Sequence, residues 1–127
     1  MKDLTITERV VDDVTVLDLT GQIRIGENTI KLRTAIREYV SKGVKKLLVN
    51  LEDVTHIDSS GLGDLVSGYV SMEKNGGVLK LLNLTDRVSE LMMITKLLTV
   101  FETFEDEKEA VSSFLTDTEE TSAAPAA

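Results

Sequence analysis

The chain has 127 residues, of which 42% are hydrophobic and 28% charged, with no cysteine and a single histidine. This is the length of one domain, and the composition is that of a soluble globular protein. The missing cysteines exclude disulfides and thiolate metal sites, and one histidine excludes a site built from several.

The net charge of −8 is unevenly distributed along the chain. Residues 1–101 carry 14 acidic and 13 basic side chains, whereas residues 102–127 carry eight acidic side chains and one lysine. A nearly neutral body with an acidic end argues against binding to nucleic acid, which requires a basic face. The sequence shows neither a signal peptide nor a long apolar segment. We therefore expect a cytoplasmic protein without membrane insertion.

The first part of the chain predicts an antiparallel hairpin followed by a helix. Apolar and polar residues alternate on both sides of the turn signal Asp12-Asp13, and Gly21 ends the second run. From Asn28 the apolar residues take the period of a helix, which Gly43 ends. Its apolar stripe is Leu32, Ala35, Ile36, Tyr39 and Val40. The apolar run Leu47–Val49 then predicts a strand buried on both faces.

The second part predicts an alternation of helices and strands. A helix from Ser60 to the Asn75-Gly76-Gly77 stop repeats the apolar stripe at Leu62, Leu65, Val66, Tyr69 and Val70. The elements expected after it are the strand Val78–Leu82, the helix Asp86–Thr95, the strand Val100–Phe104 and the helix Glu107–Leu115. The order β-β-α-β-α-β-α-β-α predicts one α/β domain over residues 1–115, with a mostly parallel sheet and an antiparallel N-terminal edge. Residues 116–127 are predicted to be a disordered acidic and alanine-containing tail.

Polar residues gather where the central strand leads into the second helix. Ligands and partners of α/β sheets are met at such edges. Asp58, Ser59 and Ser60 are all suited to cap the helix, because their side-chain oxygens accept unpaired backbone N–H groups. Gly61 and Gly63 leave the backbone open to close approach. The segment can thus be a plain helix cap or a phosphorylation switch.

The switch interpretation has a physical basis. A phosphate adds about −1.5 to −2 charges, and a helix N-terminus stabilises negative charge by roughly 0.3–1 kcal/mol. Phosphorylation would therefore leave the fold intact, while a partner fitted to the neutral serine would face an unpaired dianion at a typical cost of several kcal/mol. Catalytic alternatives lack their motifs: the serines are not in a G-x-S-x-G frame, and no phosphate-binding glycine loop is present. His56 is interpreted as a loop residue and not as a base.

Four segments carry a resemblance to a known family. They are LTG at Leu19–Gly21, LEDVTHIDSSGLG at Leu51–Gly63, NGGVLKLLNLTDRVSELMMIT at Asn75–Thr95 and VFETFEDEKEA at Val100–Ala110. Over about residues 3–115 the sequence resembles the STAS domain, the fold of bacterial anti-sigma factor antagonists.

This resemblance implies a function in partner switching. In such antagonists an anti-sigma factor with kinase activity phosphorylates the serine after the aspartate, which is Ser59 here, with Ser60 as a helix cap or secondary acceptor. The unphosphorylated form binds the anti-sigma factor and frees the sigma factor for transcription, and a serine phosphatase resets the switch. The implied chain is a monomer or weak dimer and not an enzyme. It needs no cofactor, because the kinase supplies the ATP. The partner-binding residues implied are Asp58, Ser59, Ser60, Gly61, Leu62, Gly63 and Arg24.

The chain departs from the family pattern after the second strand. Antagonists that it resembles usually carry two acidic residues where this chain has Gln22 and Arg24. Arg24 is expected to pair with Asp58 or with a phosphate on Ser59. The departure keeps open an alternative: a non-switching STAS scaffold subunit of a stressosome-like or lipid-transport complex. A small α/β enzyme is a third hypothesis, which rests on fold analogy alone.

Overall fold

The computed structural model describes residues 4–24 and 27–123 of the chain. Five strands form one sheet in the order β1-β2-β3-β4-β5. The strands are β1 (Thr5–Val11), β2 (Val14–Ile23), β3 (Lys46–Ile57), β4 (Val78–Leu82) and β5 (Thr103–Phe104). The helices are α1 (Glu27–Ser41), α2 (Ser59–Lys74), α3 (Asp86–Ile94), the short 3-10 helix η1 (Leu97–Thr99) and α4 (Glu107–Ala123).

The sheet has the predicted mixture of strand directions. β1 pairs with β2 in antiparallel fashion across a tight turn in which Asp12 takes a φ of 57°. The pairs β2–β3, β3–β4 and β4–β5 are all parallel. The predicted α/β fold with an antiparallel N-terminal edge is therefore confirmed.

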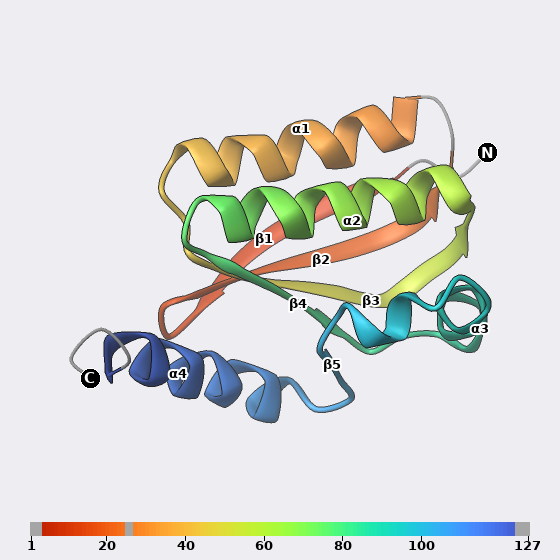
Figure 1. Ribbon diagram of the computed structural model, residues 1–127. Helices are drawn as coiled ribbons and strands as arrows, with labels where there is room; N and C mark the ends of the chain where they lie inside the picture. The colour runs from red at the N-terminus through yellow and green to blue at the C-terminus, as the bar shows by residue number, and fades with distance from the viewer. Residues whose placement is uncertain (1–3, 25–26, 124–127) are drawn as a thin grey trace.

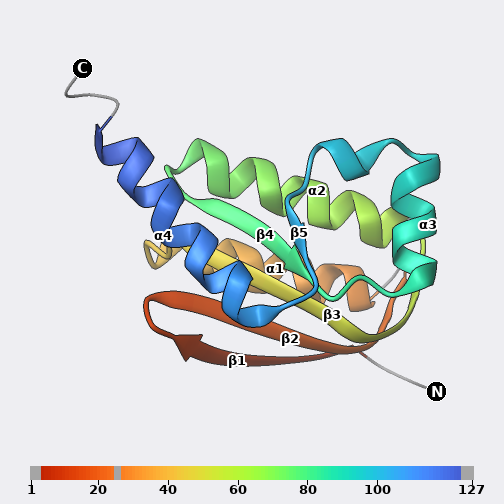
Figure 2. The same cartoon turned by 90° about the horizontal axis from the view of Figure 1, so that it is seen from below.

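The two faces of the sheet are covered differently. α1 and α2 lie side by side on one face, and α4 crosses the other (Figure 1, Figure 2). The larger apolar cluster lies under α1 and α2, with Leu32, Ile36, Leu62 and Leu65 packed on alternate residues of the strands. A smaller cluster lies under α4 around Val16, Leu48 and Phe114. α3 stands at the end of the sheet beside the start of α2 (Figure 1).

Several boundaries differ from the sequence predictions. β2 continues past Gly21, which takes a φ of 113° next to a shift in register with β3. β3 extends to Ile57 because Leu51 and Val54 continue the buried side of the strand. β5 begins only at Thr103, since Leu97–Thr99 coils into η1.

The last helix is also longer than predicted. It continues to Ala123 instead of ending at Leu115, in a stretch without glycine or proline to stop it. The division of the chain at residue 115 stays a prediction, and residues 124–127 of the predicted tail lie outside the described residues. None of the helices described here is both long and apolar enough to cross a lipid bilayer.

Candidate functional site: the turn from β3 into α2

The polar turn predicted as the functional site lies at the carboxyl edge of the parallel strands. Ile57, the last residue of β3, pairs with Ile23, the last residue of β2. The backbone N–H of Asp58 donates to the carbonyl of Ile23 at 3.2 Å. The ends of two adjacent strands therefore fix the point at which α2 begins.

Asp58 is the cap of α2. Its backbone is extended, and its carboxylate Oδ1 accepts a hydrogen bond from the N–H of Gly61 at 2.9 Å. The helix consequently begins at Ser59, and Ser60 lies inside the first turn. The prediction that Ser60 caps the helix is wrong, because Asp58 already occupies that position.

The residues predicted to meet a partner separate into outward and inward positions. Ser59 and Gly63 are exposed, and Asp58 and Ser60 are partly buried. Leu62 is 2% exposed and belongs to the core. It was predicted to bind a partner but contributes to packing under α2 instead.

Gly61 is buried for a specific reason. A Cβ on this residue would lie 2.3 Å from the carbonyl oxygen of Ile23. Its missing side chain lets α2 approach β2, whereas the sequence suggested that it leaves room for a partner. A Cβ on Gly63 would meet no atom within 4 Å, so the open backbone position on the surface is Gly63.

The family model of the STAS domain matches residues 5–110. The chain belongs to the STAS domain family. The anti-sigma-B factor antagonist of Bacillus subtilis is 41% identical over 81 residues, which are 64% of this chain and 72% of that protein. A candidate anti-sigma factor antagonist from Thermotoga maritima has a crystal structure that matches with a TM-score of 0.80 at 27% identity, over 86% of this chain and 93% of that one.

The structure of the Bacillus protein SpoIIAA in its phosphorylated form matches with a TM-score of 0.67 at 21% identity. It covers 87% of this chain and 97% of that one, and at this identity the likeness shows the fold. The relatives named as anti-sigma factor antagonists place this STAS domain in a family of regulators and not of enzymes. The predicted family and the predicted absence of enzymatic function are thus confirmed.

Arg24 directly follows β2 at the edge of this STAS domain where α2 begins. It is exposed, and its Nη1 donates to Oε1 of Gln22 at 3.2 Å. Within the described part of the chain Arg24 pairs with Gln22 and not with Asp58, the first of its two predicted partners. Its pairing with a phosphate on Ser59 stays a prediction. His56 lies in β3 and not in a loop, and its Nδ1 contacts the hydroxyl of the adjacent Thr55 at 3.2 Å.

A buried carboxylate connects the STAS domain's two neighbouring helices. Asp64 of α2 is 7% exposed, and its Oδ1 accepts hydrogen bonds from Arg33 of α1 at 3.2 Å. Its Oδ2 is buried and has no hydrogen-bond partner among the described residues. Sequence reasoning missed this pair. The periodicity gave no signal for it, because Asp64 lies outside the predicted stripe of Leu62, Leu65 and Val66.

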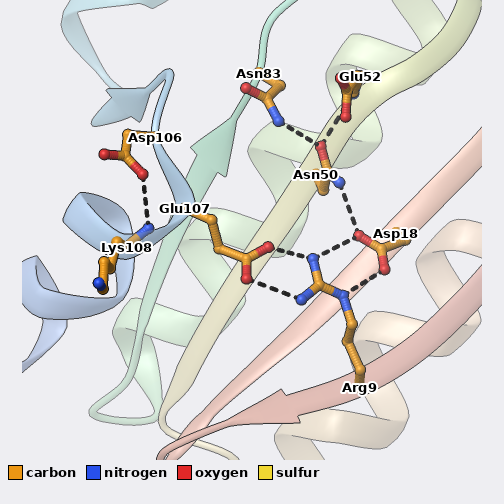
Figure 3. Close-up of polar contacts among 8 residues, drawn as sticks. All are labelled: Arg9, Asp18, Asn50, Glu52, Asn83, Asp106, Glu107 and Lys108. Atoms are coloured by element: carbon orange, nitrogen blue, oxygen red, sulfur yellow. Dashed lines mark hydrogen bonds and ion pairs between the residues drawn. The ribbon is translucent and has the colours of Figure 1, made fainter.

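A second polar cluster, which sequence reasoning also missed, lies on the opposite face (Figure 3). Arg9 of β1 donates to both carboxylate oxygens of Asp18 on β2, at 2.6 and 3.2 Å. It also donates to Glu107 at the start of α4. The hydrogen bonds from Arg9 hold the pKa of both carboxyl groups below their usual range. Asn50 and Asn83 extend the cluster across β3 and β4.

These polar clusters do not form a metal site. Among the described residues no group of three or more histidine, aspartate or glutamate side chains is placed to hold a metal ion. The Arg9 cluster joins β1, β2 and α4 and lies on the face away from α2 (Figure 3). The turn at Ser59 is therefore retained as the candidate functional site.

Proposed function

We propose that this STAS domain is an anti-sigma factor antagonist switched by phosphorylation of Ser59. The unphosphorylated form binds an anti-sigma factor that is also a serine kinase, and the phosphorylated form releases it. The observation that carries the proposal is the placement of Ser59: an exposed hydroxyl on the first residue of α2, directly after a cap that does not use it.

The contacts that hold the start of α2 in place do not depend on the Ser59 side chain, so Ser59 can be modified without a loss of the fold. The Asp58 cap and the buried contacts of Gly61 and Leu62 do not involve the Ser59 side chain. A phosphate at this position lies at the end of the helix where the backbone dipole favours negative charge. The helix is retained, and a partner seated on the neutral surface meets a dianion without a counter-charge of its own.

The proposed docking surface is the outward face of α2 next to the turn. Ser59, Gly63, Ser67 and Val70 are exposed and spaced three or four residues apart, so they lie along one side of the helix. Val70 is 40% exposed although the sequence stripe placed it inward. This combination of small polar residues and one aliphatic side chain suits a protein partner.

The names of relatives support the choice of an anti-sigma factor as the proposed partner. The Bacillus subtilis relative is named as an antagonist of an anti-sigma factor, and SpoIIAA is known in a phosphorylated form. We extend both properties to this chain: an anti-sigma factor kinase that brings its own ATP, a serine phosphatase that reverses the modification, and action in the cytoplasm.

Phosphorylation and capture test the proposal together. The native lysate is passed over wild-type, Ser59→Ala and Ser59→Asp baits, and the captured kinase is incubated with the protein and ATP before mass spectrometry. We expect phosphate on Ser59, capture by the wild type and Ser59→Ala, and loss of capture by Ser59→Asp. Ser60→Ala is the matched control and should still be phosphorylated. Absence of phosphate from Ser59 contradicts the proposal.

Gln22 and Arg24 favour a second candidate, a non-switching STAS subunit of a larger complex. Size-exclusion chromatography of a native extract distinguishes the two. A stable large assembly whose size is unchanged by Ser59→Asp would support the scaffold, whereas a small species supports the switch.

A further inference from the structure

The end of β2 and the start of α2 are held together at Ile23. Its carbonyl accepts the N–H of Asp58, its side chain packs against Gly61, and it pairs in register with Ile57. Adjacent strands lie roughly 4.8 Å apart. Arg24 directly follows this paired position on one strand and Ser59 follows it by two residues on the other, so the two residues start from neighbouring points at this edge of the sheet.

The Arg24 guanidinium is available for a new partner. It is exposed, and its hydrogen bond to the Gln22 amide is neutral at the acceptor and 3.2 Å long. A hydrogen bond between two charged groups is roughly twice as strong as one to a neutral acceptor. The planar guanidinium also matches two phosphate oxygens at once, which a lysine does not.

We propose that Arg24 is an internal clamp for the phosphate on Ser59. When Ser59 is modified, the guanidinium leaves Gln22 and pairs with the phosphate, which is thereby drawn against the end of β2. This inference rests on the proposed phosphorylation of Ser59 and adds a residue that holds the released state. The clamp favours the dianion, so the phosphate keeps its full charge at a lower pH than a free phosphoserine.

The test places phosphoserine at position 59 of the full chain by genetic encoding, which makes it independent of any kinase. The second pKa of the phosphate, ordinarily about 6, is measured by phosphorus NMR in the wild type, Arg24→Gln, Arg24→Lys and Arg37→Gln. Arg37→Gln is the matched control, because it removes the same charge from an exposed position on α1, in the groove beside Ser67 and Ser71. Amide spectra verify that each variant is folded.

We expect Arg24→Gln to raise the phosphate pKa by about half a unit, the size that an exposed ion pair gives. Arg24→Lys should restore part of the difference, and Arg37→Gln should leave the pKa at the wild-type value. Asp58 is present in all four proteins, so its effect cancels. Equal pKa values in the wild type and Arg24→Gln, or an equal shift in Arg37→Gln, overturn the clamp.

The results also distinguish a failure of the Arg24 clamp from a failure of the proposed Ser59 switch. A kinase that modifies Ser59, together with an unshifted pKa in Arg24→Gln, leaves the switch standing and removes the clamp. A shifted pKa in the encoded phosphoprotein, with no kinase acting on Ser59, removes the switch and leaves a phosphate-binding arginine.

Discussion

The two faces of the sheet are built by different means. Between the sheet and the helices α1 and α2 the contacts are mostly aliphatic, with side chains such as Leu17, Leu47 and Leu65 fully buried, and one ion pair, Arg33–Asp64, joins the two helices. Under α4 a smaller apolar cluster is supplemented by charged groups from Arg9 and Lys80. Burial of apolar surface is strong but non-directional, whereas ion pairs specify a position and add little stability when exposed.

Lys80 is an example of a charged side chain that helps to position α4. It is 1% exposed, donates to Ser113 of α4 at 2.8 Å and pairs with Glu102 at 2.7 Å. Its ammonium also lies 4.7 Å from the ring centroid of Phe114, within the range of a cation–π contact. α2, which follows the candidate site, is therefore held mainly by apolar burial, and α4 is positioned in part by charge.

The largest expected effect comes from breaking the aliphatic face. Leu65→Ala removes a fully buried side chain between α2 and the sheet and should lower the free energy of unfolding by about 2–5 kcal/mol. Urea unfolding measures it. Val70→Ala, on the exposed side of the same helix, should change it by less than about 0.5 kcal/mol. Equal losses would mean that α2 is not anchored by this face.

The approach of α2 to β2 gives a second, smaller effect. Gly61→Ala introduces a Cβ against the Ile23 carbonyl and should cost about 1–3 kcal/mol, as overpacking does. Gly63→Ala places the same methyl group in open space and should stabilise the helix by about 0.5–1 kcal/mol. Thermal unfolding of both variants checks the opposite signs, and a loss of stability in Gly63→Ala would contradict this geometry.

On the α4 face, removing a buried charge should increase stability. Lys80→Met retains an unbranched apolar stem without the desolvated ammonium, and Glu102, 59% exposed, remains solvated. We expect a gain of about 1 kcal/mol in the free energy of unfolding. Lys80→Ala, which leaves a cavity, should instead be destabilised. Equal destabilisation of both variants would show that the ionic contact, and not burial of the stem, holds α4.

The smallest expected effect is a pH dependence of the free energy of unfolding that comes from the Arg9 cluster. Contacts with Arg9 hold the pKa of Asp18 and Glu107 below the ordinary 3.8 and 4.5, so they stabilise the folded state above these values. That contribution is lost as the pH falls through the lowered values. Wild-type stability should therefore fall more steeply than that of Glu107→Gln between about pH 5 and pH 3.

The expected difference is about 0.2–1 kcal/mol, because the Glu107 side chain is 37% exposed. Urea midpoints measured across this pH range give both slopes. Glu109→Gln, an exposed carboxylate change in the same helix turn, is the control and should keep the wild-type slope. Parallel slopes for the wild type and Glu107→Gln would remove the cluster as a source of pH dependence.

The sequence allowed the fold to be predicted wherever periodicity was strong. The stripes of α1 and α2 identified these helices because one buried face repeats at a fixed spacing. The run Val78–Leu82 identified β4 because this strand is buried on both faces. Element ends were less predictable. Gly21 was a reasonable strand end, but a glycine within β2 instead accommodates a shift in register.

The candidate site was predictable in its position but not in its orientation. Three cap-forming residues in succession identified the start of α2, yet only the backbone geometry selects Asp58 as the cap and leaves Ser59 free of that task. The inward position of Gly61 depends on how closely α2 approaches Ile23. The pairs Arg33–Asp64 and Arg9–Glu107 join residues far apart in the chain, and no local pattern encodes them.

The hydrogen bond from Asp58 to Ile23 has a consequence for the rate and strength of recognition. Because the end of β2 fixes the first turn of α2, Ser59 is presented in one backbone conformation before any partner arrives. Association then loses less conformational entropy than it would for a serine on an unrestrained loop. Under the proposed phosphorylation of Ser59, the same preorganised backbone would serve both forms of the serine, and the free-energy difference between the two forms would be concentrated in the phosphate itself.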